Sequence, residues 1–361
     1  MFQDWLDRAL IFLVISCPCA LVISIPLGYF GGLGAASKNG ILFKGAKYLD
    51  ELKEVNTVVM DKTGTVTKGV FKISQIKTLD AWTEQTLMPI LLAIESKSTH
   101  PIAKAIMEYQ TDMLIPEASD VNEIAGKGLT GLISGKKVVV GNQKLMQQFD
   151  ISTPTEIAEV VESIVLVGID GEFAGFVTIA DELKEYAKQS IDRLKSDGVK
   201  ELMMLSGDKD SITQKVAAQL GIENAKGGLL PEDKLNEVEQ LKQDATRKIA
   251  FIGDGINDAP VLAASDVGIA MGAMGSDVAI ETADVIIQTD QLSKVSTGIQ
   301  IAKSTQKIIW QNIFFAFGVK IIVLILGAGG LATMWEAVFA DVGVALLAIL
   351  NAVRLQRLEW K

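Results

Sequence analysis

A small set of polar side chains in this sequence suits phosphoryl transfer. Asp61 offers a carboxylate nucleophile, Lys234 a positive charge for a phosphate group, and Ser206 a hydroxyl donor. Asp254 and Asp258 offer carboxylate oxygens, the ligands that Mg²⁺ prefers. Any one of these residues alone would carry little weight. Together they indicate an enzyme that moves a phosphoryl group.

These residues belong to a pattern of short apolar runs with strand character. The runs are residues 57–60, 202–205 and 249–252, and each is followed at once by polar loop residues. Helical patterns at residues 211–220 and 231–241 separate the second run from the third. This alternation predicts a parallel α/β sheet, in which the chemistry lies at the carboxyl ends of the strands.

Residues 70–179 interrupt the alternation after the first strand. They contain helical patterns of their own at residues 84–95 and 102–109, and strand patterns near glycines at residues 136–140 and 173–178. We therefore expect a separate inserted domain, which would bring a second part of the substrate to the strand ends.

Hydropathy divides the chain into two kinds of region. Of the 361 residues 22% are charged, yet the mean hydropathy is +0.31. Residues 9–36 hold no charged side chain, residues 313–334 hold only Lys320, and residues 338–353 hold only Asp341. A spanning helix needs roughly 20 apolar residues. We therefore expect three transmembrane helices flanking a soluble body.

Lysine and arginine residues indicate the orientation of these spans. Lys38 follows the first span, Lys303 precedes the second, and Arg354 and Arg357 follow the third, whereas the turn at residues 327–335 has none. We expect a multi-pass protein, of the plasma membrane, with its soluble body and C-terminus in the cytoplasm and its N-terminus outside.

The net charge argues against a nucleic-acid partner. The chain has 34 Lys and Arg against 44 Asp and Glu, which gives −10. Phosphate backbones are bound by clustered basic side chains, so no nucleic acid is expected to bind.

Two cysteines flank a proline inside the first span, as Cys17, Pro18 and Cys19. On a regular helix residues two apart point about 200° apart. Proline unwinds the helix locally, so both sulfurs can turn inward. We expect free thiolates that bind a soft metal ion rather than a disulfide at this spacing and depth. Lys320 and Asp341 are further candidates, because ionisable residues inside spans are costly and usually functional.

Two motifs resemble the signatures of P-type ATPases, pumps that share their core with the haloacid dehalogenase superfamily. Residues 61–65 read DKTGT, and residues 253–260 read GDGINDAP. The resemblance implies that ATP phosphorylates the aspartate of the first motif. The implied magnesium site consists of Asp61, the Thr63 carbonyl, Asp254 and Asp258, and the implied phosphate site of Lys234, Ser206 and Asp208.

The implied fold is a haloacid-dehalogenase-like α/β phosphorylation domain with a parallel sheet, an inserted α+β nucleotide-binding domain and three transmembrane helices. The expected parts are a span with the CPC motif (1–37), a membrane linker with the first part of the phosphorylation domain (38–69), the nucleotide-binding domain (70–179), the second part of the phosphorylation domain (180–300) and two C-terminal spans (301–361).

The inserted domain resembles the nucleotide-binding domain of heavy-metal-transporting P-type ATPases. In that family a glutamate and a histidine contact adenine, and glycines let the backbone approach the nucleotide. The resemblance therefore implies an ATP site of Glu95, His100, Gly126, Gly128, Gly141 and Asn142. A lone histidine is more often structural, and the first two glycines could instead form a hairpin turn.

The residues in the last two spans favour a divalent cargo. Counted from Asn351, Lys320 and Asp341 stand where copper-pumping relatives have Asn and Met, and this pairing resembles the zinc, cadmium and lead subgroup. Thiolates with a carboxylate suit Zn²⁺, Cd²⁺ or Pb²⁺ better than thioethers do, and Lys320 could pair with Asp341 once the ion has left. The implied ion path is Cys17, Cys19, Lys320 and Asp341.

The expected function is ATP-driven export of divalent heavy-metal ions through an aspartyl-phosphate intermediate. The chain shows no Thr-Gly-Glu actuator motif and no earlier spans, so we expect part of a pump that could need a separately encoded N-terminal half. Two alternatives stay open. One is a membrane-anchored phosphatase of the superfamily, disfavoured because Thr63 stands where such phosphatases carry a second acid. The other is a catalytically idle fragment that associates with complete pumps.

Overall fold

The computed structural model describes residues 2–79, 81–109, 114–253, 258–272 and 277–360. The chain divides into two compact units, an inserted unit, Thr67–Glu185, and a principal unit formed by the chain up to Val66 and from Tyr186. The inserted unit is longer at both ends than the expected residues 70–179. The reason is that strands β3 (Thr67–Thr78) and β8 (Glu172–Leu183) already pair at Thr67 and Leu183, outside the expected bounds.

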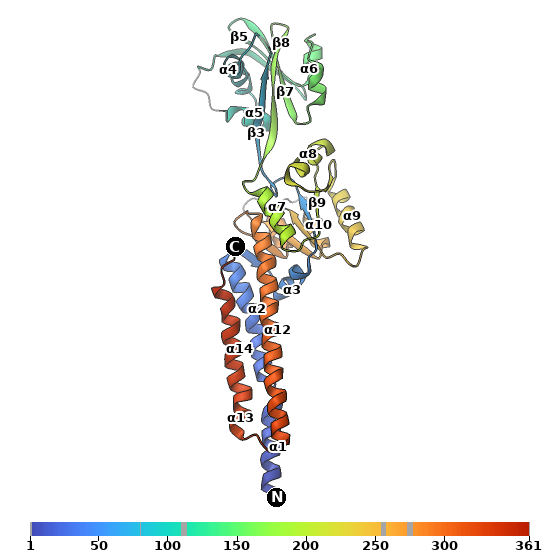
Figure 1. Cartoon of the computed structure of the whole chain (residues 1–361). Helices are drawn as coiled ribbons and strands as arrows, with labels where there is room; N and C mark the ends of the chain where they lie inside the picture. The colour runs from blue at the N-terminus through green and yellow to red at the C-terminus, as the bar shows by residue number, and fades with distance from the viewer. Residues whose placement is uncertain (1, 80, 110–113, 254–257, 273–276, 361) are drawn as a thin grey trace. The chain divides into compact units, whose positions relative to one another are not determined.

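A seven-stranded sheet forms the centre of the principal unit (Figure 1). Its order is β1-β13-β12-β11-β2-β9-β10, and its neighbours are parallel except for the antiparallel pair of β1 and β13. The strands are β1 (Ile41–Phe43), β2 (Thr57–Asp61), β9 (Glu201–Leu205), β10 (Asn224–Lys226), β11 (Ile249–Gly253), β12 (Val267–Met271) and β13 (Val285–Ile287).

The central strands of this sheet are buried along their whole length, because helices cover both faces of a parallel sheet. The three strands and two helices that the sequence predicted here are confirmed to within one residue at each end. The soluble helices of this unit are α3 (Ala46–Glu54), α7 (Ala187–Ser196), α8 (Asp210–Leu220), α9 (Pro231–Lys242), α10 (Ala259–Ala264) and α11 (Asp277–Thr282).

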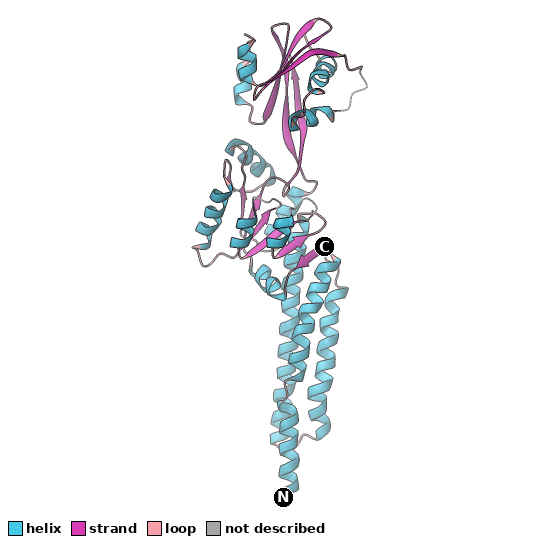
Figure 2. Cartoon of the chain, turned by 180° about the vertical axis from the view of Figure 1, so that it is seen from behind, coloured by secondary structure: helices cyan, strands magenta, loops and turns pink. Residues whose placement is uncertain are grey.

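The inserted unit is a six-stranded antiparallel sheet of order β3-β8-β7-β6-β5-β4 with helices on both faces (Figure 2). Alternate side chains of β6 point to opposite faces: Val138 and Val140 pack with α4 and α5, and Val139 packs with α6. The remaining elements are α4 (Glu84–Glu95), α5 (Pro101–Met107), β4 (Ala118–Ile124), β5 (Gly128–Ile133), β6 (Lys136–Gly141), α6 (Gln143–Gln148), the 3₁₀ turn η1 (Thr155–Glu159) and β7 (Ser163–Ile169).

Three stretches of the described residues are long and apolar enough to cross a membrane, namely Arg8–Lys38, Ser293–Ala328 and Met334–Arg357. They confirm the three expected spans, and with both sheets they confirm the expected fold class. The first span contains α1 (Phe2–Ser16) and α2 (Cys19–Lys38), and the second is α12 (Ser293–Ala328). The third contains α13 (Met334–Val338), the π-helical turn η3 (Phe339–Gly343), α14 (Val344–Val353) and the 3₁₀ turn η4 (Arg354–Arg357).

Helices α2, α12 and α14 run side by side (Figures 1 and 2). Glycines allow the close approach of α2 to α12. A Cβ atom at Gly32 would lie 2.3 Å from Thr305 Oγ1, and one at Gly28 would lie 2.7 Å from Ile309 Cγ1. Helix α12 packs on α3 and α7 at its start and continues unbroken into its membrane span.

Candidate active site and ion-binding site

Strands β2, β9 and β11 bring the expected catalytic residues to one edge of the sheet. Asp61 ends β2 opposite Leu205 of β9, so Ser206 follows at the same edge. Ile252 of β11 lies opposite Met60, one residue before Asp61. The parallel register therefore brings the carboxyl ends of these three strands to the same edge, as the sequence predicted.

Lys234 links two of these loops. Its Nζ atom donates to Asp61 Oδ1 at 2.6 Å and to Asp258 Oδ1 at 2.9 Å, and all three side chains are buried. Burial alone would lower the pKa of Lys234, but the charges of Asp61 and Asp258 and their hydrogen bonds outweigh it and raise the pKa above its ordinary value. The amine is therefore a cation, next to the carboxylate that could act as nucleophile.

A second ion pair lies at the neighbouring strand end. The buried ammonium group of Lys62 pairs with the Asp208 carboxylate, and the Asp208 N–H donates to Ser206 Oγ at 3.1 Å. Lys62 belongs to the DKTGT motif, but the sequence did not predict a role for it. Its position in the motif does not reveal that its side chain is buried, next to Asp61 in the chain.

Two threonines of the same motif differ in their surroundings. The Thr63 side chain is exposed, whereas Thr65 is fully buried and its hydroxyl has no hydrogen-bond partner among the residues that the structure describes. An unsatisfied buried hydroxyl four residues after Asp61 is available to a bound ligand, and the spacing of the motif did not reveal it. The predicted magnesium ligand Asp254 lies outside the described residues.

The inserted unit contains a cavity of about 220 Å³. All six residues that the sequence assigned to an ATP site line it: Glu95, His100, Gly126, Gly128, Gly141 and Asn142. Gly128 has φ +140°, and a Cβ atom there would lie 2.1 Å from the Val140 carbonyl oxygen, so only glycine permits this approach of β5 to β6.

Two of these lining residues also have structural partners. His100 Nδ1 accepts a hydrogen bond from the Ile102 N–H at 3.2 Å and so caps α5. Asn142 caps α6 and donates to the Gly126 carbonyl oxygen at 2.9 Å. Asn142 therefore shapes the glycine turn, and His100 lines the cavity while it caps α5.

Burial and charge change the acidity of Glu95. This side chain is 5% exposed, and desolvation, followed by the charge of Glu123, raises its pKa from 4.5 to about 7. Near neutral pH a substantial fraction of Glu95 is uncharged.

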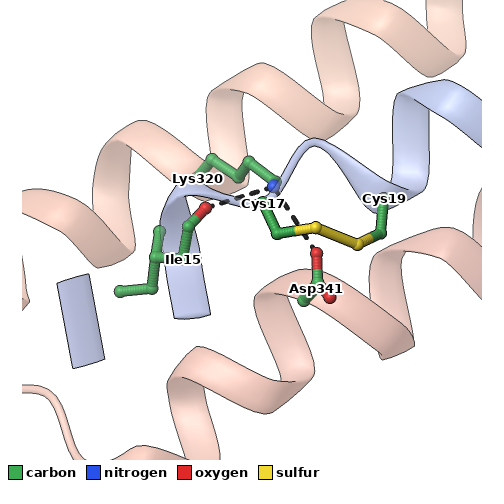
Figure 3. Close-up of a disulfide and its surroundings, with 5 residues drawn as sticks. All are labelled: Ile15, Cys17, Cys19, Lys320 and Asp341. Atoms are coloured by element: carbon green, nitrogen blue, oxygen red, sulfur yellow. Dashed lines mark hydrogen bonds and ion pairs between the residues drawn. A yellow bond between two sulfur atoms is a disulfide. The ribbon is translucent and has the colours of Figure 1, made fainter. Parts of the chain in front are cut away.

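The break in the first span creates a cluster of possible metal ligands (Figure 3). The sulfurs of Cys17 and Cys19 and a carboxylate oxygen of Asp341 lie within 4.8 Å of one another. The Lys320 ammonium lies 3.5 Å from Asp341 Oδ1 and donates to the Ile15 carbonyl at 3.1 Å. The four residues predicted for the ion path therefore meet in one place.

The structure joins Cys17 and Cys19 in a disulfide, so the expectation that no disulfide forms at this spacing was wrong. On a regular helix, two cysteines at this spacing point too far apart to form a disulfide. The helix break at Pro18 turns both sulfurs inward and also brings them together, with Cα atoms 5.5 Å apart, a usual separation for a disulfide.

Comparison with known proteins agrees with this fold. Residues 55–266 match the model of the haloacid dehalogenase-like hydrolases. The chain belongs to this family.

The relatives and solved structures indicate the branch of the family, the P-type ATPases. A zinc-transporting ATPase of Synechocystis sp. is 51% identical over 98% of this chain and 49% of its own length. A cadmium, zinc and cobalt-transporting ATPase of Bacillus subtilis is 50% identical over 99% of this chain and 51% of its own length. The chain thus spans about half the length of these relatives.

The solved structures cover both soluble and membrane parts. The crystal structure of a zinc-transporting PIB-type ATPase in the E2.Pi state matches with a TM-score of 0.89 at 35% identity, over 99% of this chain and 59% of the other. The catalytic domain of the CPx-ATPase CopB-B matches with a TM-score of 0.56 at 30% identity, over 73% of this chain and 97% of the other.

Proposed function

We propose that this chain carries the phosphorylation site, the nucleotide site and part of the ion path of a pump that exports divalent heavy-metal ions from the cytoplasm through an aspartyl-phosphate intermediate. The observation that supports a pump over a phosphatase is the cluster of Cys17, Cys19 and Asp341 inside the membrane spans. A phosphatase needs no such cluster.

Asp61 is the nucleophile in this proposal. A carboxylate oxygen attacks the γ-phosphorus of ATP, the bond from that phosphorus to the β-γ bridging oxygen breaks, and ADP leaves with the electron pair. Lys234 orients the carboxylate and offsets the charge of the phosphoryl group. Ser206 and the ion pair of Lys62 and Asp208 form the opposite side of the phosphate site. Water later cleaves the acyl phosphate and restores Asp61.

The residues at the strand ends fit a Mg²⁺ ion. Asp61 and Asp258 supply hard oxygen ligands, and the unsatisfied Thr65 hydroxyl suits a polar ligand close by. Asp61, the Thr63 carbonyl and Asp258 would hold the ion, together with Asp254. When bound, Mg²⁺ neutralises charge on the transferred phosphate.

Zinc and cadmium are the proposed cargo, as in the names of the relatives, and the soft ligand set extends this proposal to lead. Two thiolates and a carboxylate hold the ion, so the reduced chain is the binding form. Lys320 replaces the lost charge beside Asp341 when the ion leaves.

X-ray absorption of zinc bound to the full chain, reduced and in detergent, tests this ion site. We expect one zinc ion with two sulfur neighbours at about 2.3 Å. Changing both Cys17 and Cys19 to Ser should remove the sulfur neighbours, and Asp341→Asn should weaken binding roughly 10–100-fold. The exposed control Asp192→Asn should change neither. Zinc bound only through nitrogen or oxygen would refute the site.

A further inference from the structure

The nucleotide cavity of the inserted unit contains two carboxyl groups. Glu95 projects from the end of α4, and Glu123 lies on the facing strand β4. Glu95 is buried and forms no hydrogen bond or ion pair with any side chain in the part of the chain that the structure describes. A buried carboxylate without a partner is costly, so Glu95, unlike the exposed Glu123, calls for a chemical explanation.

Neither of the two described basic side chains that line this cavity is paired with these two carboxyl groups. The other titratable residues that line it are His100, from the start of α5, and Lys127, from the turn between β4 and β5. His100 Nδ1 accepts a hydrogen bond from the Ile102 N–H at 3.2 Å. The Lys127 ammonium donates to Gln148 Oε1 at 2.7 Å. The remaining wall, from β6 and β7, offers Gly141, Asn142, Ile164 and Val165 and no charge.

This charge distribution determines which end of a nucleotide faces Glu95. A triphosphate carries several negative charges, and like charges at close range repel. The phosphates therefore lie away from the Glu123 carboxylate and from Glu95 near it, and the base lies against Glu95. The edge of adenine that carries the 6-amino group presents a donor, the amino N–H, beside an acceptor, ring nitrogen N1.

A neutral carboxylic acid matches that edge and a carboxylate does not. The acid accepts through its carbonyl oxygen and donates through its O–H, whereas a carboxylate only accepts and would place a lone pair against N1. Burial and the charge of Glu123 both favour the neutral form of Glu95, whose pKa is raised to about 7.

We propose that Glu95 meets adenine as a neutral carboxylic acid, kept protonated by burial and by the neighbouring Glu123, so that nucleotide binding takes up a proton. This inference rests on the proposed binding of ATP by the inserted unit. It assigns Glu123 a role as a positioning residue, acting on the protonation of Glu95 rather than on the nucleotide. The sign of the pH dependence follows: affinity is constant well below pH 7 and falls about tenfold per pH unit above it.

Isothermal titration of the full chain in detergent with magnesium-free ATP tests the proposal. At pH 8, heats measured in two buffers of different ionisation enthalpy should show close to one proton taken up per nucleotide. Glu95→Gln should remove this uptake and the fall in affinity with pH. ATP itself also takes up a proton in this pH range, which changes the affinity of both proteins equally. Dividing the wild-type affinity by that of Glu95→Gln at each pH removes this shared effect.

Glu123→Gln and a matched control variant test whether Glu123 acts on the protonation of Glu95. Glu123→Gln should enlarge the wild-type drop in affinity between pH 5.5 and pH 8, because Glu95 then ionises more readily. The exposed Glu117, outside the cavity, provides the control, and Glu117→Gln should behave as wild type.

Two outcomes would overturn the proposal in different ways. Binding of ATP at pH 8 with no proton uptake, or with proton release, would refute the neutral acid and leave the nucleotide site standing. An absence of ATP binding in wild type at every pH would refute the nucleotide site itself.

Discussion

The buried cluster of Lys234, Asp61 and Asp258 shows at the scale of single residues how buried charges constrain one another. Lys234, 7% exposed, is held between Asp61 and Asp258. Removing a cation from such a buried cluster leaves uncompensated carboxylates, which is far costlier than losing a surface ion pair.

Lys234→Met should therefore destabilise the principal unit by about 3–5 kcal/mol and abolish phosphorylation of Asp61. Chemical denaturation of the full chain measures the loss. Lys242→Met, on the exposed end of the same helix, should cost no more than about 1 kcal/mol. Equal stability of the two variants would show that Lys234 is not holding the carboxylates together.

The residues of this cluster were largely predictable from the sequence, because Asp61, Ser206 and Asp258 each follow an apolar strand. Lys62 and Thr65 were not. They belong to the same motif, but spacing along a tight turn does not reveal which side chains turn into the site and become buried.

At the scale of secondary-structure elements, Asp197 connects α7 to α12. Its carboxylate accepts hydrogen bonds from the Ser296 hydroxyl and from Gln300 Nε2, and its backbone carbonyl accepts one from Lys303. Helix α7 leads into β9, the strand that ends just before Ser206, and α12 continues into the membrane and carries Lys320.

Asp197→Ala should lower the free energy of unfolding by about 1–3 kcal/mol, because the Ser296 hydroxyl is fully buried and loses its acceptor. Thermal unfolding of the variant measures the effect. In a double-mutant cycle, adding Ser296→Ala should recover part of the loss. Asp192→Ala, on the exposed face of α7, provides the control. Additive effects of the two substitutions would contradict the coupling.

Elements with clear periodicity and clear ends were predictable, and irregular ones were not. The strands β2, β9 and β11 agree with the sequence prediction because apolar runs and polar loops mark both ends. The π-helical turn at Asp341 and the disulfide at the α1–α2 break had no such signal. Both depend on how the helix backbone deviates from regular geometry, which spacing alone does not determine.

At the scale of the whole molecule, the chain combines a buried cluster of charged residues at the strand ends, a cavity in the inserted unit and a group of possible metal ligands between the membrane spans. The residues that the sequence proposed for each site lie together where the structure describes them, because each set belongs to a short motif with its own chemistry. The length of the pairing between β3 and β8 was not visible in the sequence, since β3 is largely exposed and the outer end of β8 is only partly buried.

The central claim is that ATP phosphorylates Asp61. The most direct test is incubation of the full chain with γ-labelled ATP and Mg²⁺, followed by acid precipitation. We expect an acid-stable, hydroxylamine-sensitive phosphoprotein with the label mapped to Asp61, present in Asp192→Asn and absent in Asp61→Asn. Label that persists in Asp61→Asn, or no label in wild type, would contradict the account.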